Sequence, residues 1–185
     1  MPRIPASSWD HGFLESIQEQ NRQGRTISPR QIEIMQKIEG RFSEEAITRT
    51  ASWRENYSAE MRDRARVVAG YYKANPPYYG DLCTSILEDD SFVPTEKQYN
   101  SMVTNKYAAK VIVAHYAEPK FPQGAKVEVR KTGGYKVAGK KGFILQVNAA
   151  PVTNAAKGTK NYLFLPVGEP TPIVVEERHL KQGRF

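Results

Sequence analysis

The chain has one cysteine and three histidines, too few for the disulfide and zinc sites that stabilise many small proteins. Long apolar runs are also missing. No segment reaches the roughly 18 apolar residues that span a bilayer, and residues 1–9 lack the apolar block of a signal peptide. The sequence therefore predicts no metal, no cofactor and no membrane partner, and a chain that stays in the cytoplasm of the cell that makes it.

Acidic residues are scarce in one part of the chain only. Residues 1–121 hold 16 Lys and Arg against 16 Asp and Glu, residues 161–185 hold 3 against 3, and residues 122–160 hold 8 against 1. The whole net charge of +7 therefore arises between residues 122 and 160. Such a concentration of one sign is typical of a site for a polyanion. A solvated loop made soluble by lysines is the alternative.

The first 120 residues show the patterns of helices joined by polar connectors. Ser28 and Gln31 form a capping box, with a proline at the first helical position and an apolar stripe behind it. Residues 95–98 repeat the capping box. The helix that they open is expected to continue through Val111.

Two stretches of this helical half also align with each other. The spacing of the aligned residues agrees to within one position, which predicts a duplicated unit of a helix, a turn and a capped helix. Coincidence is the alternative, because capping boxes are common. The aligned pairs are Gly12 with Gly80, Leu14 with Leu82, Ser28 with Thr95, Arg30 with Lys97, Gln31 with Gln98 and Met35 with Met102.

Short strands replace the helices in the last third of the chain. The strand patterns lie at residues 126–130, 142–147, 161–165 and 173–176. Four or five short strands in about 60 residues, joined by turns with glycine or proline, are what a small β-barrel needs. We therefore expect an α+β protein with a helical domain over residues 1–120 and a basic β-barrel over residues 121–185.

Four segments of this second part resemble the SH3-like barrels of the KOW and related groups. The segments are residues 124–130, 139–144, 162–165 and 175–180. Gly142 matches the glycine that makes the turn before the second strand in those families, and Glu176 and Leu180 match the acidic residue and leucine at the end of the last strand. The resemblance implies an SH3-like barrel fold. Because such barrels bind RNA, DNA or protein, the fold alone names no ligand.

The helical half is similar to a short module of bacteriophage-encoded proteins of DNA metabolism. The module has a glutamine, an arginine, a glycine, a serine and a second glutamine at set distances. In this chain they are Gln20, Arg22, Gly24, Ser28 and Gln31. The resemblance implies a viral origin, and hence the cytoplasm of a host cell, and it carries over no catalytic residue.

One turn of the basic segment carries several cations and no carboxylate. Tyr135 lies among them, and its expected role is to stack on a base, with packing as the alternative. Contacts of this kind follow the backbone of DNA or RNA with little sequence preference, since phosphates carry no base information. The predicted nucleic-acid-binding residues, besides Tyr135, are Lys126, Arg130, Lys131, Lys136, Lys140, Lys141, Lys157 and Lys160.

The helical half offers a second candidate surface. Its tyrosines, near residues 71–79, can stack on bases, bind a partner or belong to the core. The balanced charge of this half favours contact with a protein over contact with phosphates. The residues of this candidate surface are Arg62, Arg66, Lys73, Tyr78 and Tyr79.

No set of residues indicates catalysis. The acidic residues 88–90 lack the spaced partners of a metal-dependent nuclease, and the sequence has no glycine-rich phosphate loop and no nucleophile motif. We expect a non-enzymatic protein, viral by resemblance, that grips nucleic-acid phosphates through the barrel, while the helical half orients it or recruits a protein complex. The alternatives are a viral inhibitor or adaptor that binds a host or viral protein complex and, with less support, a metal-dependent nuclease.

Overall fold

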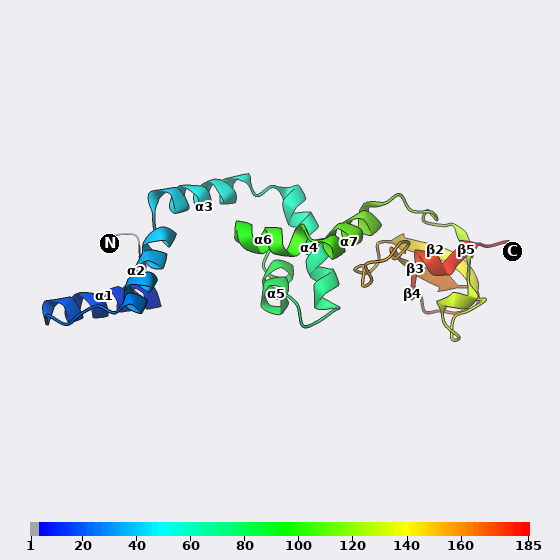
Figure 1. Ribbon diagram of the computed structural model, residues 1–185. Coiled ribbons are helices and arrows are strands. Elements are labelled where there is room, and N and C mark those ends of the chain that lie inside the picture. The colour runs from blue at the N-terminus through cyan, green and yellow to red at the C-terminus, as the bar shows by residue number, and fades with distance from the viewer. Residues whose placement is uncertain (1–3) are drawn as a thin grey trace. The chain divides into compact units, whose positions relative to one another are not determined.

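The computed structural model describes residues 4–185, which divide into two compact units, residues 4–56 and residues 57–185. Seven helices in the described residues precede a five-stranded antiparallel sheet, so the predicted α+β class is confirmed (Figure 1). The boundary that the sequence predicts near residue 121, between a helical domain and a basic barrel, stays a prediction. None of the helices within residues 4–185 has both the length and the apolar character needed to cross a membrane.

The elements follow one another in the order drawn in Figure 1. The helices are α1 (Trp9–Arg22), α2 (Pro29–Arg41), α3 (Glu44–Asn56), α4 (Ala59–Lys73), α5 (Gly80–Glu88), α6 (Glu96–Val103) and α7 (Lys106–Tyr116). The strands are β1 (Lys126–Val129), β2 (Lys141–Val147), β3 (Asn161–Pro166), β4 (Ile173–Glu176) and β5 (Leu180–Gln182). Short 3-10 turns, η1 (Lys131–Gly133) and η2 (Glu177–His179), follow β1 and β4.

In the first unit, polar contacts fix the connector between α1 and α2. The Ser28 hydroxyl accepts from the Gln31 N–H at 3.3 Å, and Gln31 Oε1 accepts from the Ser28 N–H at 2.8 Å, which confirms the predicted capping box. Gln31 Nε2 also donates to Gln20 Oε1 at 2.9 Å, so the same side chain joins both helices. Gly24, at a φ of +69°, adopts the left-handed conformation that favours glycine. Four of the five spaced residues noted in the sequence thus have a local structural role.

The helix α3 was not predicted from the sequence. Its few apolar residues do not form a stripe, and none of its residues is buried. The first unit is therefore held together by α1 and α2, whose buried residues are Leu14, Ile17 and Ile38.

In the second unit, α4 lies at the centre of the helical part and contacts α5, α6 and α7. Ser58 caps it: the Ser58 hydroxyl accepts a hydrogen bond from the Met61 N–H at 3.2 Å. Val68 and Ala69 are fully buried. The helix α4 therefore supplies the framework on which the other three helices pack.

The single helix expected from Thr95 through Val111 is in fact two helices. Thr95 and Gln98 do form the predicted capping box at the start of α6. The chain then breaks at Asn105, whose Oδ1 accepts from the N–H groups of Tyr107 and Ala108, both at 3.0 Å. An asparagine that caps a new helix competes with continuation of the old one, which explains the difference.

The sheet has the strand order β4-β3-β2-β1-β5, and the two edge strands are not paired with each other. Hydrogen bonds therefore do not close the sheet into the predicted barrel. Gly142 lies within β2, opposite Val127 and Pro166, and not in a turn as the family pattern implies. A Cβ atom at this position would lie 2.0 Å from the carbonyl oxygen of Leu165, so only glycine allows β3 to approach this closely.

The connector between β2 and β3 packs against the helices of the same unit. Val152 is buried together with Val111 and Ala114 of α7. The Lys160 ammonium donates to the backbone carbonyl of His115 and, at 3.1 Å, to Asn148 Oδ1. The end of α7 and the sheet are therefore joined by both apolar and polar contacts.

Lowering the pH from about 7 to about 5 is expected to reduce the free energy of unfolding through His115. Burial lowers the pKa of His115 below its ordinary value of 6.5, and the Lys160 ammonium lowers it further. A folded pKa below the unfolded one gives stability that is present above the unfolded pKa and is lost as the pH falls through the folded pKa. Urea unfolding at both pH values should therefore show a smaller loss for His115→Gln than for the wild type. Equal losses would rule out this role for His115.

Candidate nucleic-acid interface

The predicted phosphate-binding turn is a hairpin between β1 and β2, which we call the basic hairpin (residues 130–141). Its base is closed by two backbone hydrogen bonds, from the Val129 N–H to the Lys140 carbonyl at 2.9 Å and from the Gly139 N–H to the Val129 carbonyl at 2.8 Å. Gly134 and Gly139 both have positive φ values, which lets the chain turn twice within a few residues. The hairpin is thus a defined structure that connects β1 to the central strand β2.

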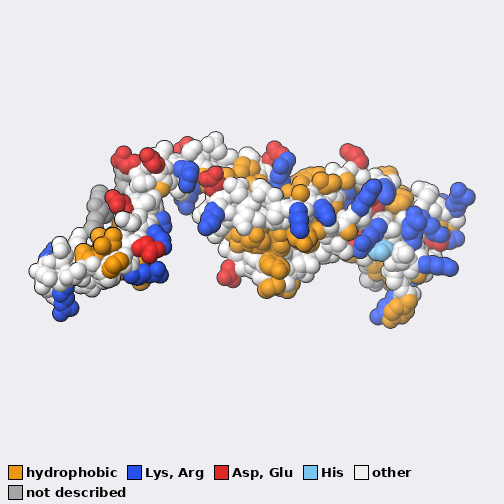
Figure 2. All heavy atoms as spheres, in the orientation of Figure 1, with side chains coloured by type: hydrophobic (Ala, Val, Ile, Leu, Met, Phe, Trp, Pro, Cys, Tyr) orange, Lys and Arg blue, Asp and Glu red, His pale blue; other side chains and the backbone are white. Residues whose placement is uncertain are grey.

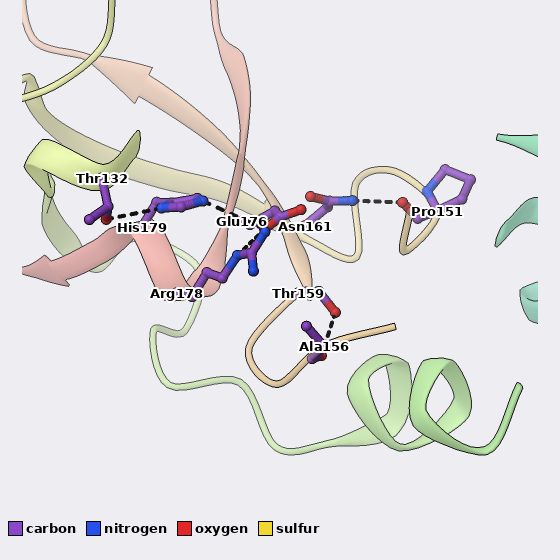
Figure 3. Close-up of polar contacts among 8 residues, drawn as sticks. All are labelled: Thr132, Pro151, Ala156, Thr159, Asn161, Glu176, Arg178 and His179. Atoms are coloured by element: carbon purple, nitrogen blue, oxygen red, sulfur yellow. Dashed lines mark hydrogen bonds and ion pairs between the residues drawn. The ribbon is translucent and has the colours of Figure 1, made fainter. Parts of the chain in front are cut away.

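Contacts with η2 and β5 anchor the start of the hairpin. The Arg130 N–H donates to the His179 carbonyl at 2.7 Å, and Arg130 Nε donates to the Leu180 carbonyl at 2.8 Å. The Thr132 hydroxyl and His179 Nδ1 share a hydrogen bond of 3.1 Å, and His179 Nε2 lies 3.6 Å from Glu176 Oε2 (Figure 3). These contacts hold the hairpin base, whereas the tip makes no hydrogen bond or ion pair to η2 or β5 in the part of the chain that the structure describes.

Tyr135 lies at the hairpin tip and is 89% exposed. The Lys136 Nζ atom lies 5.9 Å from the centre of its ring. A ring this exposed contributes almost nothing to packing, so its faces are open to solvent. The geometry allows a base to stack on the ring while an ammonium group contacts the adjoining phosphate.

Every side-chain carboxylate of residues 122–185 lies in an ion pair, and each pair joins it to a cation of the same unit. The pairs are Glu128 with Lys181, Glu169 with Lys140, Glu176 with Arg178 and Glu177 with Lys120. Lys140 is therefore largely neutralised by Glu169, at 2.6 Å. The surplus positive charge belongs to other side chains, and Figure 2 shows Lys and Arg side chains around the sheet with few acidic ones between them.

The structure brings several of the predicted cations together. Lys131, Lys136 and Lys141 are exposed and have no ion-pair partner among the described residues. Lys126 and Lys141 both lie near one aromatic ring, with their ammonium groups 5.4 and 6.0 Å from the centre of the Phe185 ring. These four lysines, with the anchored Arg130, form the part of the predicted set that phosphates can reach.

Two of the predicted residues lie elsewhere. Lys160 is only 3% exposed, and burial lowers its pKa, so its ammonium serves the fold and does not face solvent. Lys157 is exposed but lines a groove of about 700 Å³ between α7 and the connector 148–160, together with Lys110 and Lys120. Counting charge along the sequence missed Lys110 and Lys120, because acidic residues elsewhere in residues 1–121 balance them.

The cations of the second candidate surface have partners within the helical part. Arg66 pairs with Asp90, and Lys73 Nζ donates to a threonine hydroxyl of α5 at 2.6 Å. The Arg62 guanidinium lies 5.9 Å from the centre of the Tyr57 ring. Arg66 and Lys73 therefore hold α4 to α5 and the loop that follows it.

The tyrosines of this surface line a hollow of about 550 Å³, which we call the tyrosine groove. Its lining residues are Tyr71, Tyr72, Asn75, Pro76, Tyr78, Tyr79, Asn105 and Tyr107. The Tyr79 hydroxyl donates to the Ser101 carbonyl at 3.0 Å, which fixes that ring in the fold. The Tyr78 ring is 65% exposed, and its hydroxyl makes no hydrogen bond with another residue of the described range 4–185. The tyrosines at residues 78 and 79 thus differ, one fixed and one free.

Within residues 4–185, no group of three or more His, Cys, Asp or Glu side chains is placed to hold a metal ion. Cys83 is fully buried, and burial raises the pKa of its thiol. The groups that the structure offers to a ligand at the basic hairpin are ammonium groups, a guanidinium and an aromatic ring. Comparison of the chain with protein-family models, curated proteins and solved structures found no match.

Proposed function

We propose that this protein binds the phosphate backbone of DNA or RNA through the basic hairpin and catalyses no reaction. The observation that carries the proposal is the charge distribution at the hairpin. Lys131, Lys136 and Lys141 of the hairpin are exposed and have no ion-pair partner among the described residues, and Lys136 lies 5.9 Å from the centre of the exposed Tyr135 ring, while the four side-chain carboxylates of residues 122–185 are already in ion pairs. Cations arranged in this way gain binding free energy when counterions leave the nucleic acid.

The core of the sheet supports the finer assignment to the SH3-like barrels. Val175 of β4 and Leu180 of β5 belong to one buried cluster with Val127, Ile144 and Phe164. In a flat sheet the two edge strands would lie about 19 Å apart, four strand spacings. Because Val175 and Leu180, from the two edge strands, belong to the same buried cluster, we favour a strongly curled sheet with the shape of a small barrel. The two helix pairs α1–α2 and α5–α6, whose second helices both begin with a capping box, likewise support the duplicated unit.

The test is a pair of charge variants of equal net charge. Lys131→Gln with Lys136→Gln removes two hairpin cations, whereas Arg25→Gln with Lys97→Gln removes two exposed cations of the helical half. Binding of labelled duplex DNA is measured by fluorescence anisotropy over a series of salt concentrations. Four to six phosphate contacts predict a wild-type slope of log affinity against log salt of roughly 3 to 5. The hairpin variant should lower this slope by about 2, and the control variant should leave it unchanged.

Equal slopes for both variants would place the binding surface away from the hairpin. If the wild type binds no DNA or RNA in a salt-dependent way even at low ionic strength, the proposed function is wrong.

The second candidate function is that of an inhibitor or adaptor that binds a protein complex. The groove between α7 and the connector 148–160 favours it, because alanines and the exposed Val113 give this groove an apolar wall. Purifying the protein from its host with and without nuclease treatment distinguishes the two functions. A protein partner that stays bound after nuclease treatment supports the adaptor, and one that is lost supports binding through nucleic acid.

A further inference from the structure

We infer that the tyrosine groove binds the bases of a single-stranded nucleic acid, an inference that rests on the proposed function and gives it a preferred substrate. The groove lies in the helical part of the second unit, formed by α4, the turn after it and the start of α7. It shares no lining residue with the basic hairpin. A strand held there would make contacts that differ in kind from the phosphate contacts of the hairpin.

The floor of the groove is rigid. The buried Tyr72 accepts a hydrogen bond at its hydroxyl from Asn105 Nδ2 at 2.9 Å, and its ring packs edge-on against Tyr71 and Tyr79, at 5.0 and 4.8 Å between ring centres. Asn75 Nδ2 donates to the Thr153 carbonyl at 3.0 Å and ties the groove to the connector 148–160. A floor held by these contacts need not be reordered when a ligand enters.

Two of the tyrosine rings that line the groove are exposed to solvent. Tyr78 is 65% exposed and Tyr107 is 48% exposed. Neither hydroxyl makes a hydrogen bond with another described residue, so these hydroxyls do not stabilise the fold through hydrogen bonds. Exposed aromatic faces next to a rigid hollow are what stacking of unpaired bases needs. A duplex offers no such free base faces, because its bases are stacked on each other.

The charge at the groove favours a polyanion over a peptide. None of the lining residues is acidic. Lys106 Nζ lies 5.2 Å from the centre of the Tyr107 ring, and Lys106 has no ion pair among residues 4–185. A proline-rich peptide is the other ligand for a groove lined with tyrosines. Such a peptide has no phosphate for Lys106 to contact.

The groove has few polar groups free to read base edges. The amide of Asn105 is used by Tyr72 and by the cap of α7, and the amide nitrogen of Asn75 donates to the Tyr71 and Thr153 carbonyls. We therefore expect binding by stacking, with little preference for one base over another.

The test compares Tyr78→Ala and Tyr107→Ala with Tyr78→Phe and Tyr107→Phe in the full chain. The ligands are a labelled oligothymidylate of about 20 nucleotides and a duplex of the same length, measured by anisotropy at low salt. Each alanine variant should raise the dissociation constant for the oligothymidylate by about 5- to 150-fold and leave that for the duplex unchanged. Each phenylalanine variant keeps its ring and should bind like the wild type. Melting temperatures should agree among all variants, because both rings are exposed.

The outcomes separate this inference from the proposed function. If both alanine variants bind oligothymidylate like the wild type, while Lys131→Gln with Lys136→Gln weakens binding, the groove is not the site and the proposed function stands. If the wild type binds neither ligand, both ideas fail. Tyr78-dependent binding of a decaproline peptide, with oligothymidylate binding unaffected by Tyr78→Ala, would assign the groove to a peptide instead.

Discussion

Replacing Gly142 with alanine is expected to destabilise the sheet by about 3 kcal/mol or more. The new Cβ atom would lie 2.0 Å from the Leu165 carbonyl oxygen and 2.7 Å from Cε2 of Phe164. Neither atom can move away easily, because the Leu165 carbonyl is part of the backbone of β3 and the Phe164 ring is fully buried. The strands β2 and β3 must therefore separate locally, with loss of ladder hydrogen bonds.

Urea unfolding, followed by circular dichroism, measures this loss, and Gly80→Ala is the matched control. Gly80 begins α5 in the same unit and has no heavy atom within 4 Å of the position of an added Cβ. Alanine there should leave stability unchanged or raise it by up to about 1 kcal/mol. Because Gly142 lies where the basic hairpin returns to the sheet, its variant should also bind DNA more weakly without having lost a cation. An unchanged urea midpoint for Gly142→Ala would contradict the close approach of the two strands.

Replacing Glu177 with alanine is expected to cost about 3 kcal/mol of folding free energy. The buried Glu177 Oε2 atom accepts from the Tyr162 hydroxyl at 2.7 Å and from the Lys120 N–H at 3.2 Å. Burial and the Glu177 carboxylate both raise the pKa of Tyr162, so its hydroxyl keeps the proton that it donates. Without the carboxylate, both donors lose their partner, and the Tyr162 hydroxyl lies in the core where water cannot replace it.

A double-mutant cycle isolates the contact between the two side chains. Glu177→Ala, Tyr162→Phe and the double variant are unfolded in urea, and the double variant should cost less than the sum of the single ones by about 1.5 to 3 kcal/mol. Glu169→Ala is the control, because Glu169 forms a more exposed pair with Lys140 and should contribute about 1 kcal/mol or less. Additive losses in the cycle would show that Tyr162 and Glu177 stabilise the sheet independently.

Local signals in the sequence predicted local structure well. The capping boxes at Ser28 and Thr95 mark the starts of α2 and α6, because a side-chain oxygen three residues before a backbone N–H needs no tertiary contact to bond it. The same reasoning missed α3, which has no apolar stripe, and missed the break at Asn105, where a capping side chain competes with helix continuation. It also missed β5, a strand of three residues that is defined by its pairing with β1.

The sequence by itself determined that the surplus positive charge lies between residues 122 and 160, since counting charges needs no coordinates. Only the tertiary structure decided which of those cations are available to a ligand. Lys160 is buried and donates to the His115 carbonyl, and Lys140 is neutralised by Glu169. Lys131 is exposed and has no ion-pair partner among the described residues. The partners of Lys160 and Lys140 are 45 and 29 residues away along the chain. Contacts at that range depend on how the strands and helices pack, which composition and spacing cannot reveal.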